Sequence, residues 1–306
     1  MGNNISPVAC RRSIPKSGFG IFAAVIMGDS ACGGSVAARM PSQSPSAIQN
    51  ATMTVSGELR SYTIFSPLSL DPTELVPLVV AIHGYTVDST EMETSSHFDD
   101  QATQGGFIVV YPQGLNNSWN AGSCCGHNSN DDVGFIRALV DRLVSGGRVD
   151  PKRIFVTGMS NGGAMAHRLA CELSDRIAGI ASVSGALVTD ACSPARPISV
   201  LEMHGTADSL VPFDGGFTAG LGHFPSTISF MTRWATLDGC ANTPTMTRSG
   251  ITQISTWSGC REGTLVVLEA VTGADHSWFG PEDALPGEPN ATEVVWDFFS
   301  HLPARA

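Results

Sequence analysis

The stretch that decides the fold is Arg153-Ile154-Phe155-Val156-Thr157-Gly158-Met159-Ser160-Asn161-Gly162-Gly163-Ala164. Its β-branched and aromatic start favours a strand, and helix-forming residues follow at 164–170. Between them lies Gly158-x-Ser160-x-Gly162, a spacing typical of a sharp strand-to-helix turn that exposes a serine hydroxyl. Both outer positions are glycine, and we expect the reason to be steric, because a Cβ there would strike the strand or the helix. The stretch predicts Ser160 as a nucleophile at a helix N-terminus, where backbone N–H groups can hold an oxyanion.

The composition indicates a compact exported protein. The 306 residues suit one large α/β domain, the formal net charge is −11, and charged residues make up only 15% of the chain. No cluster of Lys and Arg lies outside the N-terminus, so we do not expect nucleic acid as a partner.

The N-terminus is typical of a signal peptide. A basic segment at 11–16, with a twin-arginine pattern, precedes a short apolar run at 18–27 and a small-x-small cleavage candidate at 35–37. The apolar run is too short to span a bilayer. We therefore expect a signal peptide at 1–37, a Pro/Ser-rich linker at 38–50, a catalytic domain at 51–306 and a secreted product without stable membrane insertion. The alternatives are that this N-terminal segment is a cytoplasmic tail, or that the protein is a lipoprotein acylated at Cys32.

Six cysteines follow the expected signal peptide: Cys124, Cys125, Cys171, Cys192, Cys240 and Cys260. An even number in an exported chain favours disulfides, and the lack of a CxxC pair or clustered histidines argues against a metal site. Cys240 and Cys260 flank a Thr-rich stretch and are expected to close it as a hairpin-like loop. The other four allow three pairings, which stay open.

Strand-like and helix-like segments alternate along the chain. Apolar or alternating runs predict strands at 58–65, 77–83, 107–111, 153–159, 177–183, 198–203 and 265–270. Capped or amphipathic runs predict helices at 89–104, 133–144, 161–174, 226–237 and 293–301. With the serine turn, this alternation predicts an α/β-hydrolase fold: one domain around a doubly wound, mostly parallel sheet.

The expected catalytic residues are Ser160, Asp208 and His276. A serine hydroxyl needs a base, and the base needs an orienting carboxylate. In this fold the acid and then the histidine follow the serine, on loops after successive strands. Asp208 follows the strand at 198–203, and His276 follows the strand at 265–270.

Other acids and histidines fit less well. The rival acids on loops are Asp190, Asp214 and Asp275. Asp275 adjoins His276 and is poorly placed to support the same imidazole. His204 ends a strand, so we expect a structural hydrogen bond from it. The two histidines expected to pack or to lie at the surface are His167 and His301.

An oxyanion hole needs two preorganised N–H donors. One is expected from Asn161, directly after the nucleophile. The other is expected from Tyr85 or Thr86, because Gly84 lets the backbone after the strand at 77–83 turn toward the site. A plain strand-ending turn is the alternative.

Two tryptophans are candidates for substrate binding. The polar segment 112–130 carries Trp119 and is long for a loop without a function. Trp119 and Trp278 are expected to stack on an aromatic acyl group or a sugar ring, and ordinary packing is the alternative.

In these motifs the chain resembles the secreted polyhydroxybutyrate depolymerase-like and feruloyl esterase-like carbohydrate esterases. The resemblance spans roughly residues 52–300. It rests on His83-Gly84-Tyr85, Tyr111-Pro112-Gln113-Gly114, Trp119-Asn120-Ala121-Gly122, Cys124-Cys125-Gly126, Asp131-Asp132-Val133-Gly134-Phe135-Ile136, Gly158-Met159-Ser160-Asn161-Gly162-Gly163, His204-Gly205-Thr206-Ala207-Asp208 and His276-Ser277-Trp278. It implies the same triad and the same oxyanion donors.

Two departures from the family affect the expected substrate. The histidine loop at 273–280 has fewer glycines than is usual and lacks a proline after its tryptophan, which bears on the shape of the pocket. The chain stops soon after the last predicted helix, whereas enzymes that attack crystalline polyester carry an adsorption domain. We therefore expect a soluble substrate, or a polymer reached without an anchor.

The sequence thus predicts a secreted serine carboxylesterase that works through an acyl-enzyme. The expected substrates are feruloyl or acetyl esters of plant polysaccharides, or short hydroxyalkanoate esters. No metal or organic cofactor is expected. The alternatives are an acyltransferase on the same scaffold and an inactive binding protein.

Overall fold

The computed structural model describes residues 47–126, 128–189, 191–280 and 285–305. All of them belong to one compact unit, residues 44–306. The expected signal peptide, most of the expected linker and Asp190 lie outside the described residues. Strand β1 (Ile48–Val55) begins inside the range expected for the linker, so residues 48–50 are strand.

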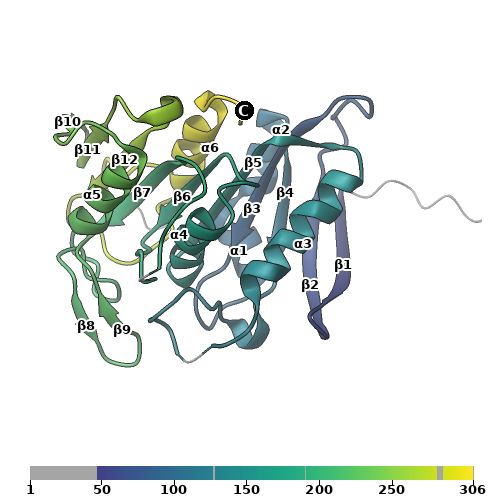
Figure 1. Ribbon diagram of the computed structural model, residues 1–306, viewed down its shortest axis with the longest axis horizontal. Coiled ribbons are helices and arrows are strands. Elements are labelled where there is room, and N and C mark those ends of the chain that lie inside the picture. Colours follow the sequence, from purple (N-terminus) through teal and green to yellow (C-terminus); the bar gives the residue numbers. More distant parts are fainter. Residues whose placement is uncertain (1–46, 127, 190, 281–284, 306) are drawn as a thin grey trace, which may run out of the picture. The chain divides into compact units, whose positions relative to one another are not determined.

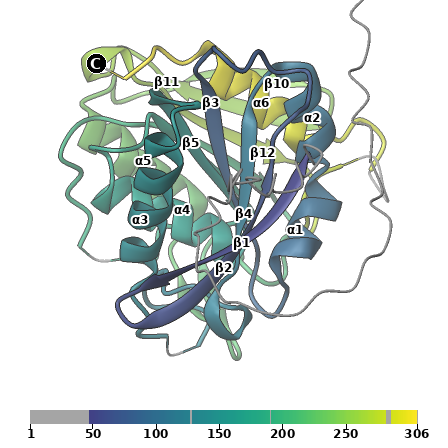
Figure 2. The same cartoon turned by 90° about the vertical axis from the view of Figure 1, so that its right-hand side faces the viewer.

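A ten-stranded sheet forms the centre of the described part of the chain (Figure 1). In spatial order its strands are β1, β2 (Glu58–Phe65), β4 (Ile108–Pro112), β3 (Val76–Ile82), β5 (Val149–Met159), β6 (Gly179–Val183), β7 (Ser199–Gly205), β12 (Val266–Val271), β11 (Thr252–Trp257) and β10 (Thr245–Ser249). The strands from β4 to β12 run parallel, and antiparallel hairpins close both edges. Figure 2 shows the β1–β2 hairpin at one of these edges. The predicted doubly wound, mostly parallel sheet is confirmed.

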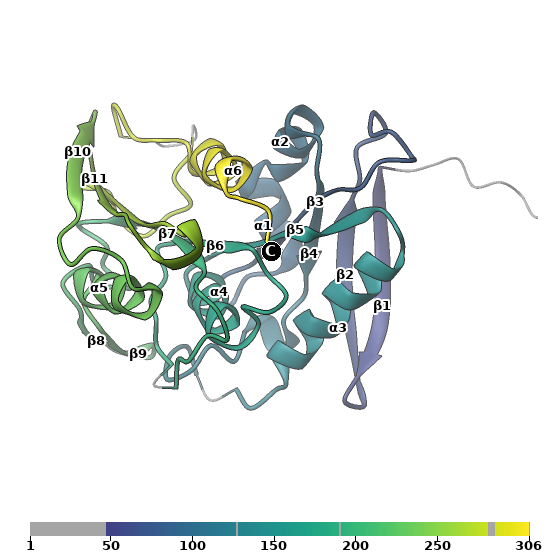
Figure 3. The same ribbon diagram turned by 45° about the horizontal axis from the view of Figure 1, so that its top comes forward.

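Helices cover both faces of the sheet (Figure 3). One face carries α3 (Asp132–Ser145), α4 (Asn161–Glu172) and α5 (Thr227–Asp238), and the other carries α1 (Ser89–Ser96), α2 (Phe98–Gly105) and α6 (Ala291–His301). A separate hydrophobic core lies under each helical layer. The central strands β3, β4, β6 and β7 are therefore buried on both faces, which explains their continuous apolar runs.

The helix predicted at 89–104 is two helices. Asp88 begins α1, because its carboxylate accepts hydrogen bonds from Thr90 N and Glu91 N. His97 has φ 53°, a left-handed conformation that ends α1 and redirects the chain into α2.

Several short elements escaped the sequence patterns. Besides β1, the structure has a two-stranded ribbon of β8 (Gly216–Thr218) and β9 (Gly222–Phe224). The β10–β11 hairpin matches the hairpin-like loop expected between Cys240 and Cys260. Two 3₁₀ turns, η1 (Leu115–Asn117) and η2 (Arg261–Gly263), complete the described elements. None of the helices in these residues is long and apolar enough to cross a membrane.

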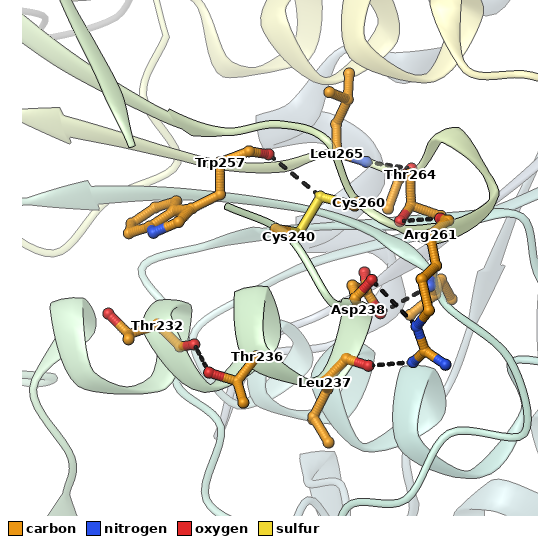
Figure 4. The surroundings of a disulfide bond; sticks show 12 residues. Thr232, Thr236, Leu237, Asp238, Cys240, Trp257, Cys260, Arg261, Thr264 and Leu265 are labelled. Atoms are coloured by element: carbon orange, nitrogen blue, oxygen red, sulfur yellow. Dashed lines mark hydrogen bonds between the residues drawn. A yellow bond between two sulfur atoms is a disulfide. The ribbon is translucent and has the colours of Figure 1, made fainter. Parts of the chain in front are cut away.

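Two disulfides form among the described cysteines. The predicted Cys240–Cys260 bond is present and closes the segment that holds the β10–β11 hairpin (Figure 4). Beside it, Arg261 donates to Leu237 O over 2.6 Å and satisfies a carbonyl at the end of α5. The second bond is Cys171–Cys192, whereas Cys124 and Cys125 are buried as free thiols.

Candidate active site

Ser160 occupies a strained turn between β5 and α4. Its φ is 57° and its ψ is −119°, a combination that few residues other than glycine adopt. A Cβ on Gly158 would lie 2.5 Å from the Gly162 backbone, and a Cβ on Gly162 would overlap the carbonyl oxygen of Ile82. The expected steric reason for both glycines is therefore confirmed. The turn is held in place by Ser160 N, which donates to Val183 O over 2.9 Å.

Asp208 and His276 meet at the carboxyl ends of β7 and β12, which are neighbours in the sheet. Asp208 Oδ2 lies 2.8 Å from His276 Nδ1, and its Oδ1 accepts hydrogen bonds from Leu210 N and Val211 N. Burial by itself would raise the pKa of Asp208, but hydrogen bonds from His204 and His276 outweigh it and hold that pKa below its usual range. The ionised carboxylate places the His276 proton on Nδ1 and leaves Nε2 as the basic nitrogen.

Ser160 and His276 line the same pocket, whose volume is about 660 Å³. No hydrogen bond joins Ser160 Oγ to His276 among the described residues, as is common in a site without substrate. The apolar part of the wall is made by Val87, Met92, Met159, Leu210, Leu221 and Trp278. The pocket is large enough for an ester with an aromatic acyl group.

The structure distinguishes between the two candidate oxyanion donors after β3. Thr86 N already donates to Asn117 O over 2.8 Å, so the Thr86 N–H is not free for an oxyanion. The Tyr85 N–H has no acceptor among the described residues. Asn161 is the first residue of α4, and its N–H has no partner within the helix. Of the two expected donors, the geometry leaves Tyr85 available and Thr86 occupied.

Trp119 is part of the core and does not line the pocket. Its side chain is 0% exposed, and its Nε1 donates to His83 O over 3.0 Å. Its backbone N and O pair with the side-chain amide of Asn161 at 2.8 and 3.1 Å. The stacking role expected for Trp119 is therefore corrected: it holds Asn161 and the loop after β3 in position.

His83 provides a second support that the sequence patterns did not single out. Its Nε2 accepts from Gly114 N over 2.9 Å, so the ring proton lies on Nδ1 and donates to Gly84 O. Burial lowers the pKa of His83, which keeps the ring neutral. The ring ties the loop that carries Tyr85 to the loop that carries Trp119.

Comparisons with known proteins agree with this geometry. The model of the Phospholipase/Carboxylesterase family matches residues 127–223, which include Ser160 and Asp208 but end before His276. Feruloyl esterase B of Piromyces equi is 30% identical over 71% of this chain and 42% of its own length. The putative esterase NocK of Nocardia uniformis subsp. tsuyamanensis is 39% identical over 54% of this chain and 50% of its own. The chain thus spans half or less of the length of these two curated relatives.

Among solved structures, an acetyl xylan esterase from Aspergillus awamori superposes with a TM-score of 0.61. The match covers 83% of this chain and 100% of that one, at 18% identity. The chain has the α/β-hydrolase fold. The expected resemblance to feruloyl esterase-like enzymes is confirmed by the sequence matches.

The other acids and histidines considered from the sequence either make structural hydrogen bonds or lie at the surface. Asp275 Oδ1 accepts from Ser209 N and from His276 N, so it braces the loop and does not support the imidazole, as expected. Asp214 and His301 are exposed. His204 and His167 are buried and hydrogen-bonded, in line with the structural roles expected of them.

The pocket lined by Ser160 and His276 also includes residues that the sequence motifs did not predict. Glu91 and Met92 from α1 and Thr218 and Leu221 from the β8–β9 ribbon all line it. These segments are short and lack a periodic pattern, so nothing in the sequence tied them to the serine turn. Among the described residues, no group of three or more His, Cys, Asp or Glu side chains is arranged to hold a metal ion.

Proposed function

We propose that the chain is a serine carboxylesterase with Ser160 as nucleophile, His276 as base and Asp208 as orienting acid. The observation that carries the proposal is one pocket that joins a serine on a strained turn to a histidine held by a buried carboxylate. The family match and the esterase relatives support the same chemistry.

The geometry suggests how each group acts. His276 Nε2 takes the proton of Ser160 as Oγ bonds to the ester carbonyl carbon. The N–H groups of Asn161 and Tyr85 hold the oxyanion. His276 then passes the proton to the leaving alcohol, and water releases the acid from the acyl-enzyme by the reverse steps.

The proposed substrates are esters with a hydroxycinnamoyl, acetyl or short hydroxyalkanoyl group. Trp278 is half-buried at the pocket wall, and its Nε1 donates to Thr292 Oγ1 over 3.0 Å, which fixes the ring in one orientation. Such a ring can stack on an aromatic acyl group or on a sugar. Relatives named as feruloyl esterases and an acetyl xylan esterase neighbour favour plant polysaccharide esters.

We further propose that the protein works outside the cell. The signal-like N-terminal sequence and the two disulfides support export, because disulfides form and persist in oxidising compartments. Mass spectrometry of the mature N-terminus after expression in an exporting host tests this; a product that starts at Met1 contradicts it.

The decisive experiment compares Ser160→Ala with the wild type on p-nitrophenyl acetate, methyl ferulate, acetylated xylan and 3-hydroxybutyrate oligomers. We expect kcat to fall at least about 10⁴-fold on every ester that the wild type cleaves, because the nucleophile is lost. Ser300→Ala is the matched control, since Ser300 is exposed on α6 and its hydroxyl contacts only Asp297 O and the neighbouring His301 ring among the described residues.

Two outcomes contradict the proposal. Undiminished hydrolysis by a folded Ser160→Ala variant would exclude Ser160 as nucleophile. Failure of the wild type on all four esters would exclude the proposed activity and favour an acyltransferase or a binding protein.

A further inference from the structure

We propose that His204 is a permanently protonated positioning residue that holds Asp208 ionised and sets the pH range in which His276 acts as base. This inference rests on the proposed triad. It is carried by a continuous chain of buried hydrogen bonds that runs from α5 through α4 and β7 to Asp208. The chain ends at Asp208, which is 5% exposed, and its other four members are all 0% exposed: Trp234, His167, Glu202 and His204.

The chain begins at a group that can only donate. The indole N–H of Trp234 lies 3.0 Å from His167 Nδ1, so that nitrogen accepts. The proton of a neutral His167 is then on Nε2, 3.0 Å from Glu202 Oε2. His167 therefore donates to Glu202.

Glu202 receives only donors. Besides His167 on Oε2, its Oε1 accepts from Gly185 N over 3.2 Å and lies 2.9 Å from His204 Nδ1. His167 and Gly185 N both donate to Glu202, so its carboxylate oxygens act as acceptors. A buried carboxylate of this kind requires a cation beside it.

The other side of His204 also faces acceptors only. Its Nε2 lies 2.8 Å from Val211 O and 3.3 Å from Asp208 Oδ2. Because neither ring nitrogen has a donor as partner, both must carry a proton. Burial opposes the charge, yet the hydrogen bonds to Asp208 and Glu202 outweigh it and raise the pKa of His204 to about 10.

The charges around Asp208 follow from this assignment. Asp208 lies between two imidazoles, with His204 on one side and His276 on the other. In the resting site Glu202 and Asp208 contribute two negative charges and His204 one positive charge. When His276 takes the serine proton, its positive charge pairs with Asp208, while the matching negative charge develops on the oxyanion. His204 and His276 flank the same carboxylate, so a positive charge on either ring acts on the other.

The surroundings of His204 contain no competing charge among the described residues. Phe213 covers the ring edge-on at a centroid distance of 5.9 Å, and Ala270 is its neighbour on β12. The titratable groups that face the ring are Glu202 and Asp208, with His167 and His276 one step further away.

The first test needs no substitution. Two-dimensional ¹⁵N NMR of the histidine rings reports whether each nitrogen carries a proton. We expect His204 to be doubly protonated from pH 6 to pH 8. A singly protonated His204 at pH 8 overturns the proposal and leaves the triad intact.

The second test is Glu202→Gln, which preserves the shape of the side chain and removes the charge that keeps His204 protonated. We expect the acid limb of the kcat/KM profile to move up by about one pH unit, with KM unchanged. Below the limb this shift lowers kcat/KM about tenfold. The ¹⁵N spectrum of the variant should show a neutral His204.

Glu269→Gln is the matched control, because Glu269 is a half-buried carboxylate on the neighbouring strand β12. Among the described residues, no hydrogen bond or ion pair joins it to the chain from Trp234 to Asp208. Its acid limb should stay in place. A uniform loss of activity over all pH values in Glu202→Gln would indicate a merely structural role and overturn the proposal. Loss of activity in Ser160→Ala remains the separate test of the triad.

Discussion

At the scale of single residues, burial separates two tryptophans that the sequence treats alike. Trp119 is closed in the core and binds the side chain of Asn161, while Trp278 stands at the wall of the pocket. An aromatic side chain can stack on a substrate only from an accessible position. Trp119 therefore supports the site, and Trp278 can contribute to the choice of acyl group.

Trp278→Leu should raise KM for methyl ferulate about tenfold, because a stacking surface of this size contributes about 1–3 kcal/mol. KM for p-nitrophenyl acetate should change much less, since an acetyl group is too small to reach the ring. Steady-state kinetics on the two esters measures the contrast.

Trp119→Phe is the companion variant. It removes the hydrogen bond to His83 O and should lower kcat for both esters to the same degree. Equal changes of KM for both esters in Trp278→Leu would contradict a role in acyl recognition.

At the scale of elements, the parallel strands bring the site together and the edge hairpins protect the sheet. The β10–β11 hairpin pairs with β12 at the edge and is tied back by Cys240–Cys260 to the end of α5. The hairpin is far along the sheet from β5, which carries Ser160 at its end. Removing the disulfide should therefore change the free energy of unfolding more than it changes kcat.

The double variant Cys240→Ser/Cys260→Ser should therefore lower the free energy of unfolding by about 3 kcal/mol, the typical effect of a bridge that closes a loop of this length. The value of kcat at 25 °C should stay within about twofold of the wild type. Urea unfolding followed by circular dichroism, together with ester kinetics, checks both expectations.

Cys171→Ser/Cys192→Ser is the comparison variant, with a similar sequence separation of 21 against 20 residues. Because Cys171 belongs to α4, the helix that begins beside Ser160, this pair should affect kcat more. A larger loss of kcat in the Cys240/Cys260 variant would contradict the expected independence of the edge hairpin.

At the scale of the whole molecule, several buried groups bias stability toward mildly acidic pH. Burial raises the pKa of Asp238 and of Glu269 to about 7 each, and the pKa of His204 is raised to about 10. Carboxyls with raised values destabilise the fold as pH rises from their usual values near 4 to about 7. A histidine with a raised value stabilises the fold below about 6.5, and this gain is lost as pH rises toward 10. Asp208 acts oppositely, because its lowered pKa costs stability only below about 3.8.

The melting temperature should therefore be highest near pH 4–6 and fall as pH rises to 9. Asp238→Asn should reduce this fall, since Asp238 Oδ2 is buried without a hydrogen-bond partner among the described residues and its charge is lost in the variant. Oδ1 keeps its role, which is to accept from Ile198 N. Differential scanning calorimetry at pH 5 and pH 9 measures the effect.

Asp214→Asn, at an exposed position, should leave the slope unchanged. A wild type that is more stable at pH 9 than at pH 5 would contradict the linkage drawn from Asp238, Glu269 and His204.

The sequence by itself determined the fold class, the serine turn and the order of the proposed catalytic residues. The roles of Gly158 and Gly162 can be predicted from the sequence because the steric constraint on them comes from the turn itself. The central strands can be predicted because burial on both faces leaves an unbroken apolar run. Asp208 and His276 could be predicted because each lies on the loop after a predicted strand.

Only the tertiary structure decided which groups share a pocket and which protons they carry. The burial of Trp119, the occupied N–H of Thr86 and the protonation of His204 depend on contacts between segments that are far apart in the chain. No local pattern encodes a contact of this kind, because it arises only when the sheet brings distant loops and helices side by side. The sequence motif therefore predicts the role of Ser160, whereas the charges around His276 depend on contacts that only the folded molecule makes.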